Sequence, residues 1–210
     1  MPQMSNPWLD IPLADYEGHM SSAGVRQLTA LAELFDRALT LARPESVTVL
    51  GVAGGNGLEK INQSVTKRIV GVDINQQYLD EVQRRFSSLA GLELHCLDLA
   101  GPDFSLAPTA LVHAALIFEH TGLDPALQNA LSLVAPGGRF SVVLQLPCET
   151  EQGVSATNYP SIQKLKHHFE LIDTAEFQHL LQQAGFHLIE QEIQPLPSGK
   201  ALCFCMFENA

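Results

Sequence analysis

Three glycines, Gly54, Gly55 and Gly57, occur close together in the stretch GVAGGNG, between the β-branched run SVTVL and the polar run LEKINQSV. Glycine lets the chain turn sharply, and its missing side chain lets a ligand approach the backbone N–H groups. A helix that begins directly after such a turn directs the positive end of its dipole at the ligand. The pattern therefore predicts a ligand-binding turn between a strand and a helix.

Asp73 is the next residue whose position suggests chemistry, because it ends the following apolar run, IVGVD. In an open α/β sheet that binds a nucleotide, an acidic residue about 20 positions after the glycines binds the ribose hydroxyls. Asp73 follows Gly55 at close to this spacing. Its type and position predict a carboxylate that holds a sugar; the alternative is that Asp73 only caps the helix that follows.

The spacing of the glycines separates two classes of cofactor. A dinucleotide fingerprint reads G-x-G-x-x-G, and its last glycine allows the helix to pack closely on the strand. From Gly55 this chain reads G-N-G-L-E-K, so Lys60 stands where the last small residue belongs. A nicotinamide cofactor is therefore disfavoured.

Several motifs resemble those of the class I S-adenosylmethionine-dependent methyltransferases and occur in the order typical of that family. VLGVAGGNG at residues 49–57 resembles the family's first motif, and LIFEH at residues 116–120 resembles the motif after its fourth strand. ALQNALSLVAPGGRFSVV and LLQQAGFHLIEQE are similar to two later junctions of helix and strand. The likeness covers roughly residues 46–208. It implies S-adenosylmethionine as the cofactor and methyl transfer as the reaction.

The resemblance also implies roles for single residues. The glycine turn would hold the amino-acid end of the cofactor, Asp73 would bind its ribose, and Asp98 would accept a hydrogen bond from the adenine amine. The residues expected to bind the cofactor are Ala53, Gly54, Gly55, Gly57, Asp73, Ile74, Asp98, Leu99 and Phe118.

The chain departs from the family pattern at two positions of the first motif. Gly51 stands where the family has an acid, and Ala53 stands where it has the first glycine. We expect Ala53 to fit with a negative φ, and we expect backbone carbonyls or Tyr16 to replace the missing acid. The departure at Gly51 leaves open a non-catalytic S-adenosylmethionine-binding protein, and a nicotinamide-dependent oxidoreductase is a less favoured alternative.

Methyl transfer by direct in-line displacement needs mainly the approach of two atoms and the exclusion of water. An oxygen acceptor must also lose a proton, and histidine is the commonest agent. His120 falls at the end of the fourth predicted strand, and Tyr16 and His19 lie in an N-terminal segment of a kind that often folds over the cofactor in this family. These three are the candidate catalytic residues. No metal is expected, because no carboxylates and histidines have ligand spacing.

Around these residues the hydrophobic period alternates between strand and helix after an irregular stretch at residues 1–20. Such alternation predicts parallel strands joined by crossover helices. We expect an α/β fold: a Rossmann-like, doubly wound, mostly parallel seven-stranded sheet with an antiparallel strand in a C-terminal hairpin and helices on both faces. The predicted strands are 46–52, 67–74, 92–99, 109–118, 139–146, 186–193 and 200–207, and the predicted helices are 21–42, 58–65, 75–89, 123–134 and 173–185.

The chain is expected to form one domain, with a cap segment and helix at residues 1–45 before a core at residues 46–210. Residues 147–172 lack a clear period and are predicted to form an insertion or lid.

Composition limits the partners. The formal net charge is −11, with 23 acidic and 12 basic residues and no basic cluster, so neither nucleic acid nor an acidic membrane is expected to bind. The four cysteines form no CxxC pair, and the N-terminus has no apolar signal core. A cytoplasmic enzyme with a small-molecule methyl acceptor is the resulting prediction, and its oligomeric state is open.

Overall fold

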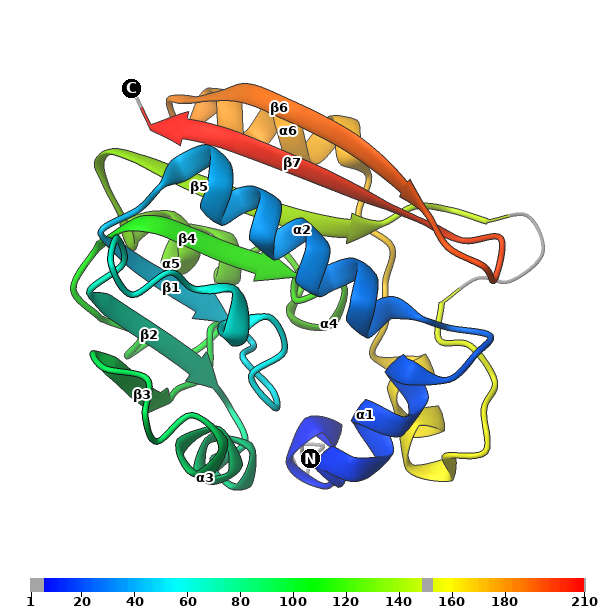
Figure 1. The fold of residues 1–210 in the computed structure, drawn as a ribbon. Helices are drawn as coiled ribbons and strands as arrows, with labels where there is room; N and C mark the ends of the chain where they lie inside the picture. Colours follow the sequence, from blue (N-terminus) through cyan, green and yellow to red (C-terminus); the bar gives the residue numbers. More distant parts are fainter. Residues whose placement is uncertain (1–5, 149–152, 210) are drawn as a thin grey trace.

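The computed structural model describes residues 6–148 and 153–209. A seven-stranded sheet crosses the molecule, and helices lie on both of its faces (Figure 1). The strands are β1 Ser46–Leu50, β2 Arg68–Asp73, β3 Leu92–Cys96, β4 Thr109–Ala115, β5 Val134–Gln145, β6 Phe186–Pro195 and β7 Ala201–Asn209. Their order across the sheet is β3-β2-β1-β4-β5-β7-β6.

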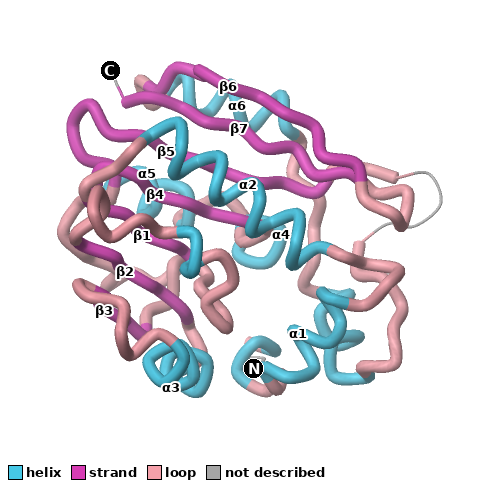
Figure 2. Tube along the Cα trace, in the orientation of Figure 1, coloured by secondary structure: helices cyan, strands magenta, loops and turns pink. Residues whose placement is uncertain are grey.

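All pairs in the sheet are parallel except those of β7, which runs antiparallel to both β5 and β6. This topology confirms the predicted α/β fold with its antiparallel C-terminal strand. Because the parallel strands point the same way, the carboxyl ends of β1, β2, β4 and β5 meet at one edge, where open α/β sheets bind ligands. Figure 2 shows loops and short helices at this edge.

Helices α2 (Gln27–Ala42) and α3 (Gln76–Arg85) cover one face of the sheet. The other face is covered by α4 (Phe118–Thr121), α5 (Ala126–Ser132) and α6 (Thr174–Gln183). Successive strand residues enter different cores, so Ile69 packs with α2 while Val70 packs with α5. A sheet covered on both faces needs apolar residues at consecutive positions, which explains the continuous apolar runs of the strands.

The predicted helix at residues 58–65 is wrong. Only a short 3-10 turn, η2 (Leu58–Lys60), follows the glycines, and Ile61 is already extended. The side chain of Asn62 then accepts hydrogen bonds from the backbone N–H of Ser64 at 3.0 Å and from its hydroxyl at 2.7 Å. Such local side-chain bonds compete with helix formation. As a result, no α-helix directs its positive N-terminal end at the glycine turn.

The N-terminal part also differs from the prediction. Residues 7–21 form a short 3-10 helix, η1 (Pro7–Leu9), and the helix α1 (Leu13–Ser21), where an irregular stretch was expected. The helix predicted at 21–42 begins only at Gln27, because Arg26 before α2 adopts a left-handed conformation with φ 49°. Both η1 and α1 contact the 3-10 helix η3 (Pro160–His167), and Figure 1 shows all three beside the carboxyl edge of the sheet.

The other predicted helices are present but shorter. Asn75 caps α3 through its side chain, and Asp173 caps α6 by accepting from the backbone N–H groups of Ala175 and Glu176. None of the helices within residues 6–148 and 153–209 has the length and apolar composition that crossing a bilayer requires.

Candidate active site

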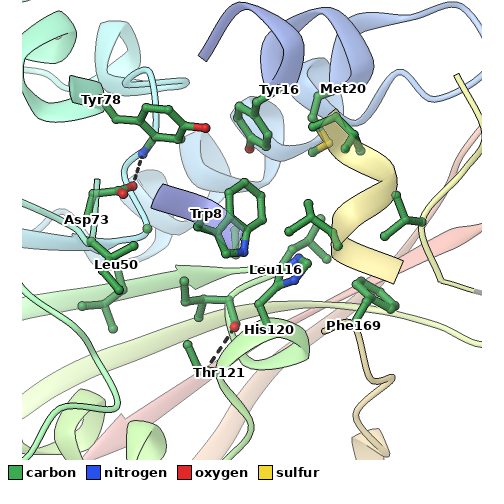
Figure 3. A pocket seen from close by; sticks show the side chains of 18 of the residues that line it. Trp8, Tyr16, Met20, Leu50, Asp73, Tyr78, Leu116, His120, Thr121 and Phe169 are labelled. Atoms are coloured by element: carbon green, nitrogen blue, oxygen red, sulfur yellow. Dashed lines mark hydrogen bonds between the residues drawn. The ribbon is translucent and has the colours of Figure 1, made fainter. Parts of the chain in front are cut away.

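A cavity lies between the carboxyl edge of the sheet and the N-terminal segment that contains η1 and α1. It holds about 1160 Å³ of empty space, including the part that opens to solvent. Its walls come from the ends of β1, β2, β4 and β5, from Trp8 and Tyr16 of the N-terminal segment, and from Leu165 and Phe169 in and after η3. Figure 3 shows Asp73 on one side of this space and His120 and Phe169 on the other.

Most of the site residues predicted from the sequence border this cavity. They are Tyr16, His19, Ala53, Asp73, Ile74, Asp98, Leu99 and His120. Four others do not line it: Gly54, Gly55, Gly57 and Phe118. The sheet edge therefore brings together residues that lie far apart in the sequence.

Asp73 is held in a fixed orientation at the end of β2. Its side chain is 9% exposed, and its two carboxylate oxygens accept hydrogen bonds from the backbone N–H groups of Ala53 and Asn75, both at 2.9 Å. Burial raises the pKa of Asp73, and the N–H groups of Asn75, Ala53 and Ile74 work in the opposite direction. A carboxylate has about four acceptor sites, so Asp73 can accept a further bond from a ligand in the cavity.

The first motif differs from its expected geometry at Ala53. Its φ is 45°, in the left-handed region, so the expectation of a negative φ is wrong. The amide of Ala53 bonds to Asp73, which fixes this conformation. Gly51 also has a positive φ, of 69°, and a side chain there would place its Cβ 2.9 Å from the Cδ1 of Ile117. A side chain at position 51 would be strained in this backbone conformation, which disfavours an acid there.

The three glycines of the turn serve packing. The carbonyl of Gly54 accepts from the guanidinium of Arg85 at 3.1 Å. A Cβ on Gly55 would lie 2.5 Å from the ring of Phe86, and a Cβ on Gly57 would lie 2.9 Å from the ring of Phe35. The absence of side chains at these glycines lets α2 and the end of α3 pack closely against the turn. The three glycines do not line the cavity.

Asp98 and Leu99 border the cavity beyond the end of β3. Leu99 is buried, whereas Asp98 is exposed and accepts a hydrogen bond from the backbone N–H of Ala100 at 2.9 Å. Phe118, in contrast, lies in the core with its ring 5.5 Å from that of Phe177 and is fully buried. Its position does not support the predicted contact with a cofactor.

His120 occupies a nearly closed, apolar position. Its ring makes edge contacts with Trp8, at 4.9 Å between centroids, and with Phe169, at 5.3 Å. Burial lowers the pKa of His120 to about 4, while a hydrogen bond with the backbone of His168 acts in the opposite direction. Within the described part of the chain the buried Nδ1 atom has no hydrogen-bond partner. The neutral ring therefore borders the cavity, while its Nδ1 atom is buried without a hydrogen-bond partner.

Tyr16 and His19 reach the cavity from α1. The Tyr16 ring stacks on Tyr78 and meets Trp8 edge-on. Burial, and then the carboxylates of Asp73 and Glu17, raise the pKa of Tyr16 above its usual range, so its hydroxyl keeps its proton. The Nδ1 atom of His19 lies 2.8 Å from the hydroxyl of Thr157.

Several wall residues were not predicted. Trp8 closes the cavity, and Tyr78, which helical spacing assigns to the core, is buried but also lines the space. A buried polar group was missed as well: Gln27, Gln145, Ser155 and Lys200. One signal was available for Gln145, because this polar residue ends the apolar run FSVVL of a central strand.

The comparisons with known proteins agree with this geometry. A family model described as a methyltransferase domain matches residues 16–191. Curated protein sequences give no match to the chain.

Solved structures show the same fold at low sequence identity. The N-methyltransferase NodS from Bradyrhizobium japonicum WM9, in complex with S-adenosyl-L-homocysteine, is 16% identical, with a TM-score of 0.63 over 98% of this chain and 93% of NodS. The magnesium protoporphyrin IX methyltransferase ChlM from Synechocystis PCC 6803, with bound S-adenosylmethionine, is 10% identical, with a TM-score of 0.70 over 100% of both chains. The cyclase SpnF is 12% identical, with a TM-score of 0.65 over 86% of this chain and 80% of SpnF. Because the family model covers most of the sequence, the chain belongs to the methyltransferase domain family.

Proposed function

We propose that this protein is an S-adenosylmethionine-dependent methyltransferase that acts on a small-molecule acceptor. The observation that carries the proposal is the position of Asp73, whose oriented carboxylate lies at the edge of a largely apolar cavity and retains acceptor capacity for ribose hydroxyls. The cofactor bound to the neighbours NodS and ChlM, or its demethylated product, is the ligand that this arrangement fits.

The residues on the Asp73 side suit the parts of S-adenosylmethionine. Asp73 would hold the ribose, and the apolar side chains of Leu50, Val72 and Leu99 would enclose the adenine, with Asp98 at its rim. The family acid is missing at Gly51, but the hydroxyl of Tyr16 has no hydrogen-bond partner among the described residues and lies near Asp73. This hydroxyl would take over the contact with the amino group of the cofactor.

When bound, the cofactor would supply an electrophilic methyl group for in-line displacement by the acceptor. His120 stays neutral at physiological pH because its pKa is about 4. Its Nδ1, which is buried and unpartnered in this structure, would accept a hydrogen bond from a hydroxyl or amine of the acceptor once the ring turns toward the cavity, and so orient the attacking atom. Trp8 and Phe169 exclude water from this position. His19 and Tyr16 complete the same wall from α1.

The enclosure of the cavity favours a small acceptor. The N-terminal segment covers it on one side and residues 153–169 on another, which leaves room for a compact molecule and not for an extended polymer. The net charge of −11 acts against nucleic acid in the same way. The cytoplasmic location and the absence of a metal remain predictions of the sequence.

Calorimetry with S-adenosylhomocysteine and with NADH tests the proposal. We expect the first to bind and the second not to, because the glycine turn lacks the helix on which a dinucleotide site depends. Binding of NADH alone would contradict the proposal. If S-adenosylhomocysteine binds but no methyl transfer is seen with a broad set of hydroxyl, amine, thiol and carbon acceptors, the non-catalytic alternative replaces it.

A further inference from the structure

Four buried polar side chains gather at the end of the cavity away from Asp73. Gln145 ends β5, and Asp73 ends β2, with β1 and β4 between these strands. Since neighbouring strands lie about 4.8 Å apart, this separates the two residues by about 14 Å along the sheet edge. Gln27, Ser155 and Lys200 join Gln145 there, and each of the four is less than one-tenth exposed.

Hydrogen bonds connect this group into one chain. The Nε2 atom of Gln27 donates to the Oε1 of Gln145 at 3.3 Å, and the Nε2 of Gln145 donates to the carbonyl of Gly153 at 3.3 Å. The ammonium of Lys200 donates to the same carbonyl at 2.6 Å and to the hydroxyl of Ser155 at 2.8 Å. The lysine therefore fixes residues 153–155 in place as part of the wall, and it also takes part in interactions beyond these two bonds.

The two carboxamides are oriented but not saturated. The backbone N–H of Gln145 donates to the buried carboxylate of Glu119 at 2.8 Å, which fixes the end of β5. Among the described residues, the Oε1 atom of Gln27 accepts no hydrogen bond, and it is not sealed from the cavity. Burying a carboxamide without all of its hydrogen bonds is costly. A ligand in the cavity could form the hydrogen bonds that these carboxamides do not make within the protein.

The space between Asp73 and the carboxamide pair is apolar. The rings of Trp8, His120 and Phe169 and the side chains of Ile162 and Leu165 border it. Aromatic rings of this kind favour a flat, apolar ligand.

We propose that Gln27 and Gln145 determine which acceptor the enzyme takes, a deduction that rests on the proposed function. The acceptor is a planar, mainly apolar small molecule with a neutral amide-like group that both donates and accepts hydrogen bonds. The carboxamides hold this group, while the ring lies against Trp8 and Phe169 and places the methylated atom at His120. Lys200 acts here as a positioning residue and does not bind an anionic substituent.

Three probes of equal shape test the proposal: meta-hydroxybenzamide, meta-hydroxyacetophenone and meta-hydroxybenzoate. Their dissociation constants are measured by ligand-observed NMR in the presence of saturating S-adenosylhomocysteine. The test variants are Gln27→Met and Gln145→Met, which keep the length of the side chain. The matched control is Gln178→Met, because Gln178 is a half-buried glutamine of α6 that lies outside the cavity. A variant with Lys200→Met tests the role assigned to the lysine.

We expect the wild type to bind the amide about five- to tenfold more tightly than the ketone, as loss of one or two buried hydrogen bonds implies. Both cavity variants should reduce this preference to about twofold or less, and Gln178→Met should retain it. Equal binding of amide and ketone by the wild type overturns the proposal. So does a preference that survives both substitutions, or tighter binding of the benzoate that disappears in Lys200→Met.

S-adenosylhomocysteine affinity is measured on every variant in the same samples. Unchanged affinity shows that the cofactor half of the site is folded, so that a loss of the preference for the amide is caused by removal of the glutamine carboxamide. If the wild type does not bind S-adenosylhomocysteine, the proposed function fails, whatever the three probes show.

Discussion

Arg85 of α3 and Glu17 of α1 form a two-pronged ion pair directly beside the glycine turn. One prong joins Nη2 to Oε2 at 3.0 Å, the other joins Nη1 to Oε1, and Nη1 also donates to the carbonyl of Gly54. Two further bonds connect α3 and its cap to the N-terminal segment before α1, from the Asn75 side chain to the carbonyl of Trp8 at 2.9 Å and from the Tyr78 hydroxyl to the carbonyl of Ile11 at 2.8 Å. The N-terminal segment that covers the cavity is thus fastened to α3.

Substitution of Arg85 by Met should release this cover. Because both side chains are about one-third exposed, we expect S-adenosylhomocysteine to dissociate about two- to fivefold faster, measured by stopped-flow fluorescence of Trp8. Arg84→Met is the control, since among the described residues Arg84 pairs only with Glu81, on the surface of α3. Equal rates for wild type and Arg85→Met would show that the ion pair does not limit ligand release.

Asp73→Asn should weaken S-adenosylhomocysteine binding by about ten- to a hundredfold, since a charged hydrogen-bond acceptor is lost from a buried position. Isothermal titration calorimetry measures the affinity, and Asp98→Asn provides the comparison. Asp98 is exposed, so its loss should cost about fivefold at most. A larger effect at Asp98 than at Asp73 would contradict the assignment of the ribose site. Thermal unfolding without ligand shows whether each variant is folded.

Glu119 makes the stability of the fold depend on pH. Burial raises its pKa to about 7, above the value of 4.5 for an exposed glutamate, so the folded protein binds its proton more strongly than the unfolded chain does. This contribution to stability is full below pH 4.5 and is lost as the pH rises through about 7. The Glu119→Gln variant should not lose stability in this way, because glutamine does not ionise, and its side-chain oxygen can still accept the hydrogen bond from the N–H of Gln145.

Urea unfolding of wild type and Glu119→Gln between pH 5 and pH 9 measures this difference. At pH 5 we expect similar free energies of unfolding; at pH 9 the variant should be more stable than the wild type by up to about 3 kcal/mol. Comparing the two proteins cancels the titration of the buried histidines. Parallel curves for the two proteins across this range would exclude the ionisation of Glu119 as the cause.

His120→Asn should lower kcat for a hydroxyl acceptor about a hundredfold, because the group that orients the acceptor and shares its proton is lost. The affinity for S-adenosylhomocysteine should stay within about twofold, since His120 lies across the cavity from Asp73. His187→Asn, on the exposed face of β6, is the control. Unchanged kcat in His120→Asn would remove His120 from the reaction.

The sequence predicts the sheet well for a physical reason. Every strand is a run of apolar or alternating residues between turn signals, and β1, β2, β4, β5 and β7 are largely buried on both faces, so the pattern is strong and local. The helix predicted at 58–65 failed because Asn62 bonds to Ser64 and the chain becomes extended at Ile61. The helix α1 was missed because Pro7 and Pro12 indicate an irregular stretch, although Pro12 lies only at its cap.

A site residue could be predicted only where its local sequence also fixes its place in the fold. Asp73 lies at the end of an apolar strand, and the structure places it in the cavity wall. The glycines of the turn were expected to face a ligand, but their orientation depends on Phe35 and Phe86, which are remote in sequence. Gln27 and Lys200 come from distant elements, and no local pattern connects them to Gln145.

The most direct test of the cofactor site is a crystal structure of the protein soaked with S-adenosylhomocysteine. We predict electron density for the nucleoside at the carboxyl edge of β1 and β2, with a ribose oxygen within hydrogen-bond distance of the Asp73 carboxylate. Density for the nucleoside at another place, or a cavity closed by Trp8 and Tyr16 at saturating ligand, would contradict it.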